Sequence, residues 1–151
     1  MIRVKICGIT SPEDARLTVA AGADAIGLVF AESPRRVDLV RARAILEAVG
    51  PFVTPVAVFV DSPLEEIRTV TEKLGITTVQ LHGLECPEKL EELRPLKVIR
   101  GVRVGGPEDL EELERSQADA FLLDARVPGK MGGTGVTFDS VSYTHLTLPT
   151  N

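Results

Sequence analysis

The chain has 151 residues, of which 44% are hydrophobic and 26% charged, enough for one domain with a hydrophobic core. It contains no run of about 18 apolar residues, and its short, charged start is unlike a signal peptide, so neither a membrane span nor export is expected. The net charge of −5, without a basic cluster longer than Arg35-Arg36, disfavours binding to nucleic acid. Cys7 and Cys86 form no C-x-x-C pair, which disfavours a disulfide framework or a zinc site. We therefore expect a cytoplasmic protein without a metal.

Six short apolar runs recur along the chain, and each is typical of a parallel β-strand that is covered on both faces. They are Val4–Cys7, Ala25–Phe30, Val56–Val60, Thr78–Leu81, Val98–Val102 and Ala120–Asp124. Because parallel strands need long crossover connections, a helix is expected between successive runs.

Helix signals do occur between the runs. Ser11-Pro12-Glu13-Asp14 and Ser62-Pro63-Leu64-Glu65 each place a Ser at the N-cap, Pro at the first helical position and an acid in the first turn. The Pro-acid pattern recurs after Cys86 and after Gly106. Three glycines stand where helices should end, at Gly22, Gly50 and Gly75. A short motif also repeats, since Gly22–Ala25 resembles Gln117–Ala120, and both should lead from a helix into a strand.

The alternation of strands and helices predicts an α/β fold with a parallel sheet. The pattern alone does not separate a barrel from an open, doubly wound sheet. A closed barrel takes about 200–250 residues, so this chain would stop short of closure after about six βα units. Residues 140–151 are rich in Thr and Ser and carry no helical stripe. We interpret residues 1–139 as the domain and 140–151 as a non-native tail; a native, irregular C-terminus is the alternative.

Polar residues stand at the ends of several predicted strands, where parallel α/β folds place their chemistry. Because side chains alternate along a strand, Lys5 and Cys7 share one face of the first strand, and the apolar residues on its other face should meet the helices. Gln80 and His82 likewise share a face of the fourth strand, and Asp124 ends the sixth. The candidates are Cys7, Asp61, Gln80, His82 and Asp124.

Each candidate also has a purely structural interpretation. A cysteine is often a buried core residue, an Asp at a strand end often makes local turn bonds, and His82 before Gly83 fits a turn. Lys5 fits the role of a partner for a carboxylate. Gly132–Gly135 lacks the spacing of a phosphate or dinucleotide loop and fits a simple flexible loop.

Five motifs in a fixed order favour the functional interpretation of these residues over the structural one. They are Val4–Thr10, Gly27–Phe30 with Ser33–Arg36, Val56–Val60, Val79–Gly83, and Leu122–Asp124 with Gly132–Gly135 and Thr137–Asp139. Each is weak alone, but the ordered set over residues 1–139 resembles phosphoribosylanthranilate isomerases closely. The resemblance implies a (β/α)8 TIM barrel, incomplete here because strands 7 and 8 are missing.

The resemblance also implies a reaction of tryptophan biosynthesis. It is the Amadori rearrangement of N-(5-phosphoribosyl)anthranilate to 1-(2-carboxyphenylamino)-1-deoxyribulose 5-phosphate, without cofactor or metal. By the match, Cys7 is the general base and Asp124 the general acid, each worth roughly 10²–10⁴ in rate. Cys7 must act as a thiolate, which Lys5 on the same face would favour, and Asp124 must keep its proton in a dry pocket. Arg36 matches the residue that holds the anthranilate carboxylate.

The match places Gln80 and His82 in the pocket wall, without proton transfer, and Gly133, Thr134 and Gly135 in a mobile loop over the substrate. The implied partner is a small phosphosugar, and full-length members would be monomers or homodimers. In the family, the loops after strands seven and eight bind the phosphate group of the substrate. Without these strands the barrel cannot close, and two strand edges stay unpaired. We therefore expect the chain as written to be inactive and poorly soluble.

Two other interpretations stay open. Another phosphate-binding barrel, such as indole-glycerol-phosphate synthase, would use Lys and Glu at strand ends and leave Cys7 without a role. A non-catalytic flavodoxin-like binding domain would need a phospho-acceptor, for which Asp61 is the one candidate, although Ser62-Pro63 after it fits a helix start better.

Overall fold

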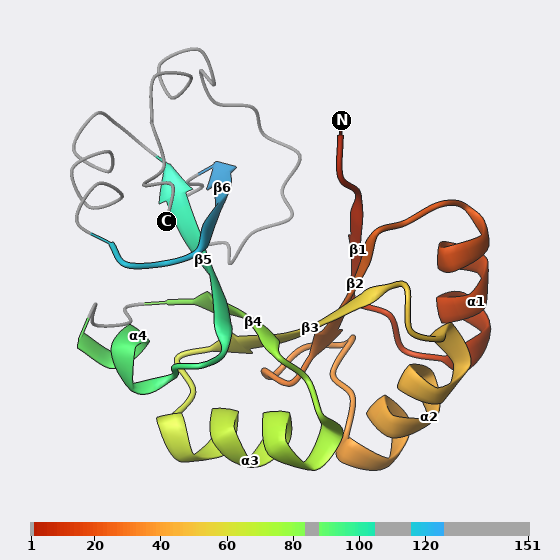
Figure 1. Cartoon of the computed structure of the whole chain (residues 1–151), viewed down its shortest axis with the longest axis horizontal. Helices are drawn as coiled ribbons and strands as arrows, with labels where there is room; N and C mark the ends of the chain where they lie inside the picture. The colour runs from red at the N-terminus through yellow and green to blue at the C-terminus, as the bar shows by residue number, and fades with distance from the viewer. Residues whose placement is uncertain (1, 84–87, 105–115, 126–151) are drawn as a thin grey trace.

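The structure is a computed structural model that describes residues 2–83, 88–104 and 116–125. Its strands form one parallel sheet in sequential order (Figure 1). They are β1 (Lys5–Cys7), β2 (Ala25–Val29), β3 (Thr54–Val60), β4 (Thr78–His82), β5 (Lys97–Val104) and β6 (Ala120–Ala125). All six predicted strands are confirmed. The sequential order excludes the flavodoxin-like alternative, because a doubly wound sheet reverses its strand order at a switch point.

The described helices are α1 (Pro12–Ala20), α2 (Leu39–Val49), α3 (Leu64–Leu74) and α4 (Glu88–Glu92), and none of them is long and apolar enough to cross a membrane. The predicted start of α1 is confirmed. Ser11 accepts a hydrogen bond from the backbone N–H of Asp14 at 3.1 Å, and Pro12 takes the first helical position. Asp38 caps α2 in the same way, through the backbone N–H of Arg41 at 2.7 Å.

The predicted cap of α3 is wrong. Pro63 keeps an extended backbone, with φ −67° and ψ 148°, so the helix begins at Leu64 and Ser62 lies one residue too early to cap it. The predicted helix ends are confirmed: Gly50 and Gly75 are the C-cap residues of α2 and α3, and Gly75 has the left-handed φ of 68°. Gly106, Gly132–Gly135 and the tail at 140–151 lie outside the described residues.

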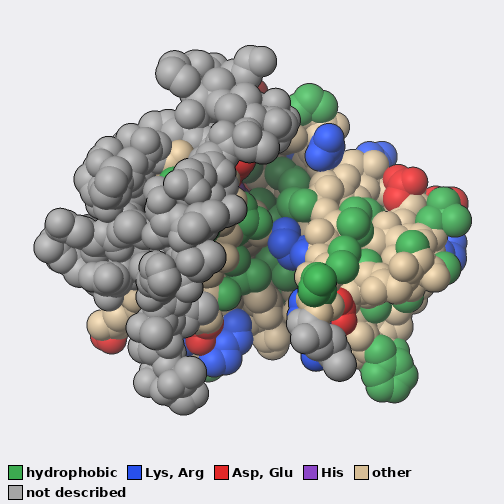
Figure 2. All heavy atoms as spheres, turned by 90° about the horizontal axis from the view of Figure 1, so that it is seen from above, with side chains coloured by type: hydrophobic (Ala, Val, Ile, Leu, Met, Phe, Trp, Pro, Cys, Tyr) green, Lys and Arg blue, Asp and Glu red, His purple; other side chains and the backbone are tan. Residues whose placement is uncertain are grey.

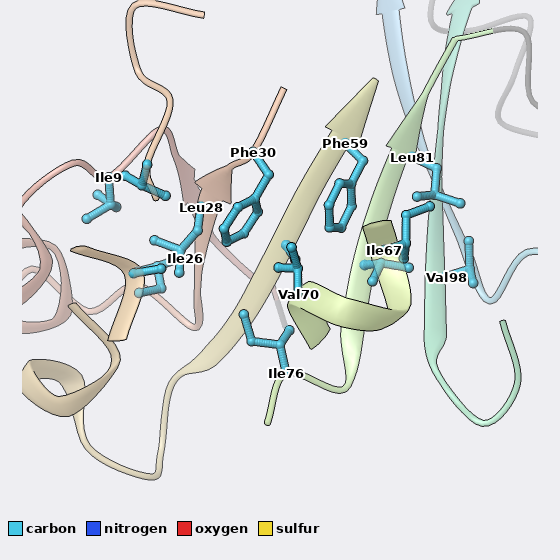
Figure 3. Packing of buried hydrophobic residues seen from close by; sticks show 14 of the residues in the cluster. Ile9, Ile26, Leu28, Phe30, Phe59, Ile67, Val70, Ile76, Leu81 and Val98 are labelled. Carbon is cyan, nitrogen blue, oxygen red and sulfur yellow. The ribbon is translucent and has the colours of Figure 1, made fainter. Parts of the chain in front are cut away.

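The core lies between the sheet and its helices. Ile26, Leu28 and Phe59 are fully buried on the helix-facing side of the sheet, and Phe30 stacks on Phe59 with ring centroids 5.5 Å apart. Figure 3 shows these strand residues packed beside side chains from the helical layer, such as Ile67 of α3. Burial of this apolar surface holds the helices against the sheet and leaves the opposite face for the polar residues.

The outer face of β1 departs from expectation. Val4 and Ile6 should meet helices, but they are 45% and 43% exposed. β1 stands at the end of the strand order, so only β2 borders it among the described strands. A side chain on such an edge has fewer neighbours to bury it, whatever its polarity.

The repeated motif marks two equivalent strand entries. Asp24 accepts from the backbone N–H of Val4, and Asp119 from that of Val98, each at 2.8 Å. The bond from Val4, with help from Arg3, lowers the pKa of Asp24. Burial raises the pKa of Asp119, but the bonds that it accepts outweigh this and lower it to about 2. Each carboxylate thus joins the start of one strand to the turn that leads into the next.

Candidate active site

The face opposite the helices carries the predicted site residues. Paired residues in neighbouring strands project from the same face of a sheet. Cys7 pairs with Gly27 and Gly27 with Val56. Val58 lies two residues beyond Val56 in β3, and therefore on the same face, and it pairs with Gln80 of β4. In β5 and β6, Arg103 pairs with Asp124. Following this register around the sheet puts Cys7, Gln80, His82 and Asp124 on one face. The predicted pairing of Gln80 with His82 on one face of their strand is confirmed.

Cys7 lies at the C-terminal end of β1, against Gly27 of β2. A Cβ atom added to Gly27 would be 2.7 Å from Cys7 Sγ and 3.1 Å from its Cα, closer than van der Waals contact allows. The thiol is free and exposed on this face. Only a glycine at position 27 leaves room for the sulfur in this position, and the sequence alone did not indicate this requirement.

The side chains of Gln80 and His82 form a hydrogen bond on β4. Gln80 is 3% exposed, and its Nε2 lies 2.6 Å from Nε2 of His82. Burial lowers the pKa of His82; the nearby Asp124 acts against this, while Lys5 and Arg103 add to it. Residues of four strands therefore act on one another across the same space.

Two cations, Lys5 and Arg103, also lie on this face of the sheet. Lys5 lies one position below Cys7 on the same face, and its Nζ is buried without a hydrogen-bond partner in the part of the chain that the structure describes. Arg103 is the register partner of Asp124. Sequence reasoning missed Arg103, although the alternation Ile99, Gly101, Arg103 along the strand would have placed it. Figure 2 shows Lys and Arg side chains lying among hydrophobic ones near the middle of the face that it presents, which suits an anionic small molecule.

Arg36 lies just beyond β2. Its backbone N–H donates to the carbonyl of Ser33 at 3.0 Å, and it forms an isolated parallel bridge with Val29. The Arg36 side chain is exposed and so within reach of solutes. The neighbouring Arg35, not predicted, packs its side chain against Gly8, the residue after Cys7. The loops after β1 and β2 therefore touch beside the thiol.

Asp61 directly follows β3 and lies against the loop after β4. It has a left-handed φ of 48°, its carboxylate packs on Gly83, and its backbone N–H donates to the carbonyl of His82 at 3.1 Å. Asp61 is thus a residue that joins two loops. The predicted loop residues Gly133, Thr134 and Gly135 lie outside the described residues.

The arrangement offers a thiol, a carboxyl group, an imidazole and two cations on one polar face. Among residues 2–83, 88–104 and 116–125, no three His, Cys, Asp or Glu side chains gather as metal ligands do. Such a set is suited to proton transfer on a small anionic substrate.

Comparison with known proteins shows the family to which this chain is similar. Residues 4–147 match the sequence pattern of the family described as N-(5'phosphoribosyl)anthranilate (PRA) isomerase. The N-(5'-phosphoribosyl)anthranilate isomerase of Rubrobacter xylanophilus is 50% identical in an alignment of 143 residues that covers 92% of this chain and 69% of that protein.

Solved structures agree. The phosphoribosyl anthranilate isomerase of Thermotoga maritima superposes with a TM-score of 0.84 at 42% identity, over 92% of this chain and 68% of that one. An isomerase in complex with reduced 1-(o-carboxyphenylamino)-1-deoxyribulose 5-phosphate gives 0.78 at 40% identity, over 83% and 66%. The curated relatives are longer, since the chain spans 61–70% of their length. The six strands are thus those of an incomplete TIM barrel, and the chain belongs to the N-(5'-phosphoribosyl)anthranilate isomerase family.

Proposed function

We propose that this chain carries the acid–base half of a phosphoribosylanthranilate isomerase, with Cys7 as the general base and Asp124 as the general acid. The observation that supports this most directly is the register, which puts both side chains on the polar face at the C-terminal ends of the first and sixth strands. In barrel enzymes this end of the strands carries the chemistry.

The reaction needs two proton transfers of opposite sense. Asp124 donates its proton to the ribose ring oxygen while the anilino nitrogen pushes electrons toward C1, so the C1–O bond breaks and an iminium ion forms. The Cys7 thiolate then takes the C2 proton, and the C–H electron pair forms the C1–C2 double bond and neutralises the nitrogen. The resulting enolamine tautomerises to the ketone, which leaves atoms and charge balanced without a redox partner. Neither step requires a cofactor or a metal.

The remaining assignments concern binding. Arg36 would hold the anthranilate carboxylate, since a guanidinium group meets a carboxylate through two parallel hydrogen bonds. Gln80 and His82 would line the pocket, and Gly133, Thr134 and Gly135 would close over the substrate. We expect a complete member to act in the cytoplasm on the phosphosugar alone, as a monomer or homodimer.

The test is a chimera in which residues 1–139 are followed by the remaining C-terminal part of the Rubrobacter xylanophilus relative. We expect the chimera to convert the aldose substrate to the ketose, followed by the appearance of a ketone carbon in ¹³C spectra, and the 151-residue chain alone to give no turnover. Cys7→Ala and Asp124→Asn should each lower kcat by roughly 10²–10⁴-fold.

Two outcomes would count against this assignment. Nearly full isomerase activity in Cys7→Ala would remove the base and favour a barrel of the indole-glycerol-phosphate synthase type. A folded chimera that binds the substrate without converting it would refute the acid–base assignment as a whole.

A further inference from the structure

The contact between Gln80 and His82 links the orientation of the amide to the imidazole nitrogen that carries the proton. In this orientation of the Gln80 amide its nitrogen Nε2 donates, and Nε2 of His82, 2.6 Å away, accepts with its lone pair, while Oε1 of Gln80 is buried and has no hydrogen-bond partner among the described residues. In a neutral imidazole the proton must then be on Nδ1. Gln80 is 3% exposed, so water does not compete for this bond.

The ring orientation is fixed from the other side by Gly101 of β5. Leu81 pairs with Arg100, so the next residues, His82 and Gly101, stand opposite each other. A Cβ atom at position 101 would clash with Nδ1 and Cε1 of His82. The imidazole therefore lies across the glycine, with its Nδ1 edge toward β5 and its Nε2 edge toward Gln80.

The charges around this ring make its protonation state important. Lys5, Arg103 and Asp124 act on its charge from β1, β5 and β6, and the titratable thiol of Cys7 lies on the same face. The paired residues of β2 and β3 on the same face, such as Val29 and Val58, carry no charge. Two cations, Lys5 and Arg103, already act on this space, and an imidazolium would add a third. Asp124 has to keep its proton to act as the acid, so a charged His82 would oppose the chemistry.

We propose that Gln80 is a positioning residue: by donating to Nε2 of His82, it holds the imidazole neutral, with its Nδ1–H directed over Gly101, so that the site beside Asp124 gains a hydrogen-bond donor but no positive charge. The donor would serve a hydroxyl or ring oxygen of the sugar. The catalytic part of this inference rests on the proposed function; the tautomer does not.

The test measures the tautomer directly. The chain has two histidines, His82 and His145. Long-range ¹H–¹⁵N spectra of the histidine-labelled 151-residue chain, and in parallel of the chimera, should show His82 protonated on Nδ1 at pH 7 and titrating below about pH 6.5. In Gln80→Leu the Nδ1–H signature should disappear. In Gln80→Glu the new carboxylate should accept from Nε2–H, so that His82 becomes cationic and titrates at least one pH unit higher.

Turnover in the chimera supplies the second readout. Gln80→Leu and Gln80→Glu should lower kcat by about tenfold or more while KM changes little, in line with other residues that orient a functional imidazole. Thr78→Val is the matched control, because Thr78 shares the face and strand of Gln80 but lies one step further from His82; it should change neither the spectra nor kcat.

The outcomes separate the two proposals. Protonation of His82 on Nε2 in the unaltered chain would overturn the role of Gln80, even if the chimera were an active isomerase. So would an unchanged kcat in both Gln80 variants. Loss of the isomerase reaction from a folded chimera would instead refute the proposed function, and the spectra would still decide the tautomer.

Discussion

The close contact between Gly27 and Cys7 gives the sharpest prediction. In Gly27→Ala the new methyl group would start 2.7 Å from Cys7 Sγ, 3.2 Å from its Cβ and 3.1 Å from its Cα, where ordinary contacts begin at 3.4 Å. The sulfur can swing away, but the Cα belongs to the backbone of β1. The strand must therefore move from β2 by a few tenths of an ångström, and the thiol by more.

Both movements have a measurable cost. Overpacking of this kind destabilises a protein by about 1–3 kcal/mol, and displacement of a catalytic group by about 1 Å costs about 10²-fold in rate. We therefore expect Gly27→Ala to lower the urea midpoint of the chimera and to reduce kcat about 100-fold. Gly75→Ala is the control: its Cβ meets open space, but its φ of 68° strains an alanine. It should cost about 1 kcal/mol without lowering kcat. Full turnover by Gly27→Ala would refute the placement of the catalytic sulfur over this glycine.

Two further predictions concern stability. Asp119 has a pKa of about 2, below its ordinary value near 3.9, so its stabilising effect is complete above about pH 4 and is lost as the pH falls toward 2. Because its ion pairs with Lys97 and Arg94 are partly exposed, the contribution of Asp119 to the free energy of unfolding should not exceed about 1 kcal/mol. The urea midpoints of the unaltered chain and of Asp119→Asn should therefore converge as the pH falls from 4 to 2. A difference between the two midpoints that stays constant over this pH range would contradict the prediction. Phe59→Ala empties a fully buried site and removes the stack on Phe30, so the free energy of unfolding should fall by about 3–5 kcal/mol, measured with urea; a loss below 1 kcal/mol would show that the core collapses around the gap.

Much of the fold follows from local rules that the sequence displays. Period-two alternation is a property of the strand itself, so the sequence predicts that Lys5 shares a face with Cys7, and Gln80 with His82. Capping works over three residues, so Ser11 was predicted correctly, whereas Ser62 failed because the chain stays extended through Pro63.

The parts that escaped prediction depend on neighbours distant in sequence. Nothing near Gly101 in the chain indicates that an imidazole covers it, because that contact depends on the register between β4 and β5. The exposed outer face of β1 reflects its place at the end of the strand order, which local polarity does not encode.

The two glycines share one geometric reason. Neighbouring strands lie about 4.8 Å apart, so a side chain that leans sideways on the polar face enters the space of the paired residue on the next strand. Cys7 leans over Gly27 and the ring of His82 over Gly101, and in each pair the glycine is on the strand that follows. A glycine leaves this space open, whereas the Cβ atom of any other residue would meet the thiol or the imidazole. The two glycines thus make room for the thiol and the imidazole to lie in these directions, so residues without a reactive side chain help to set the geometry of the site.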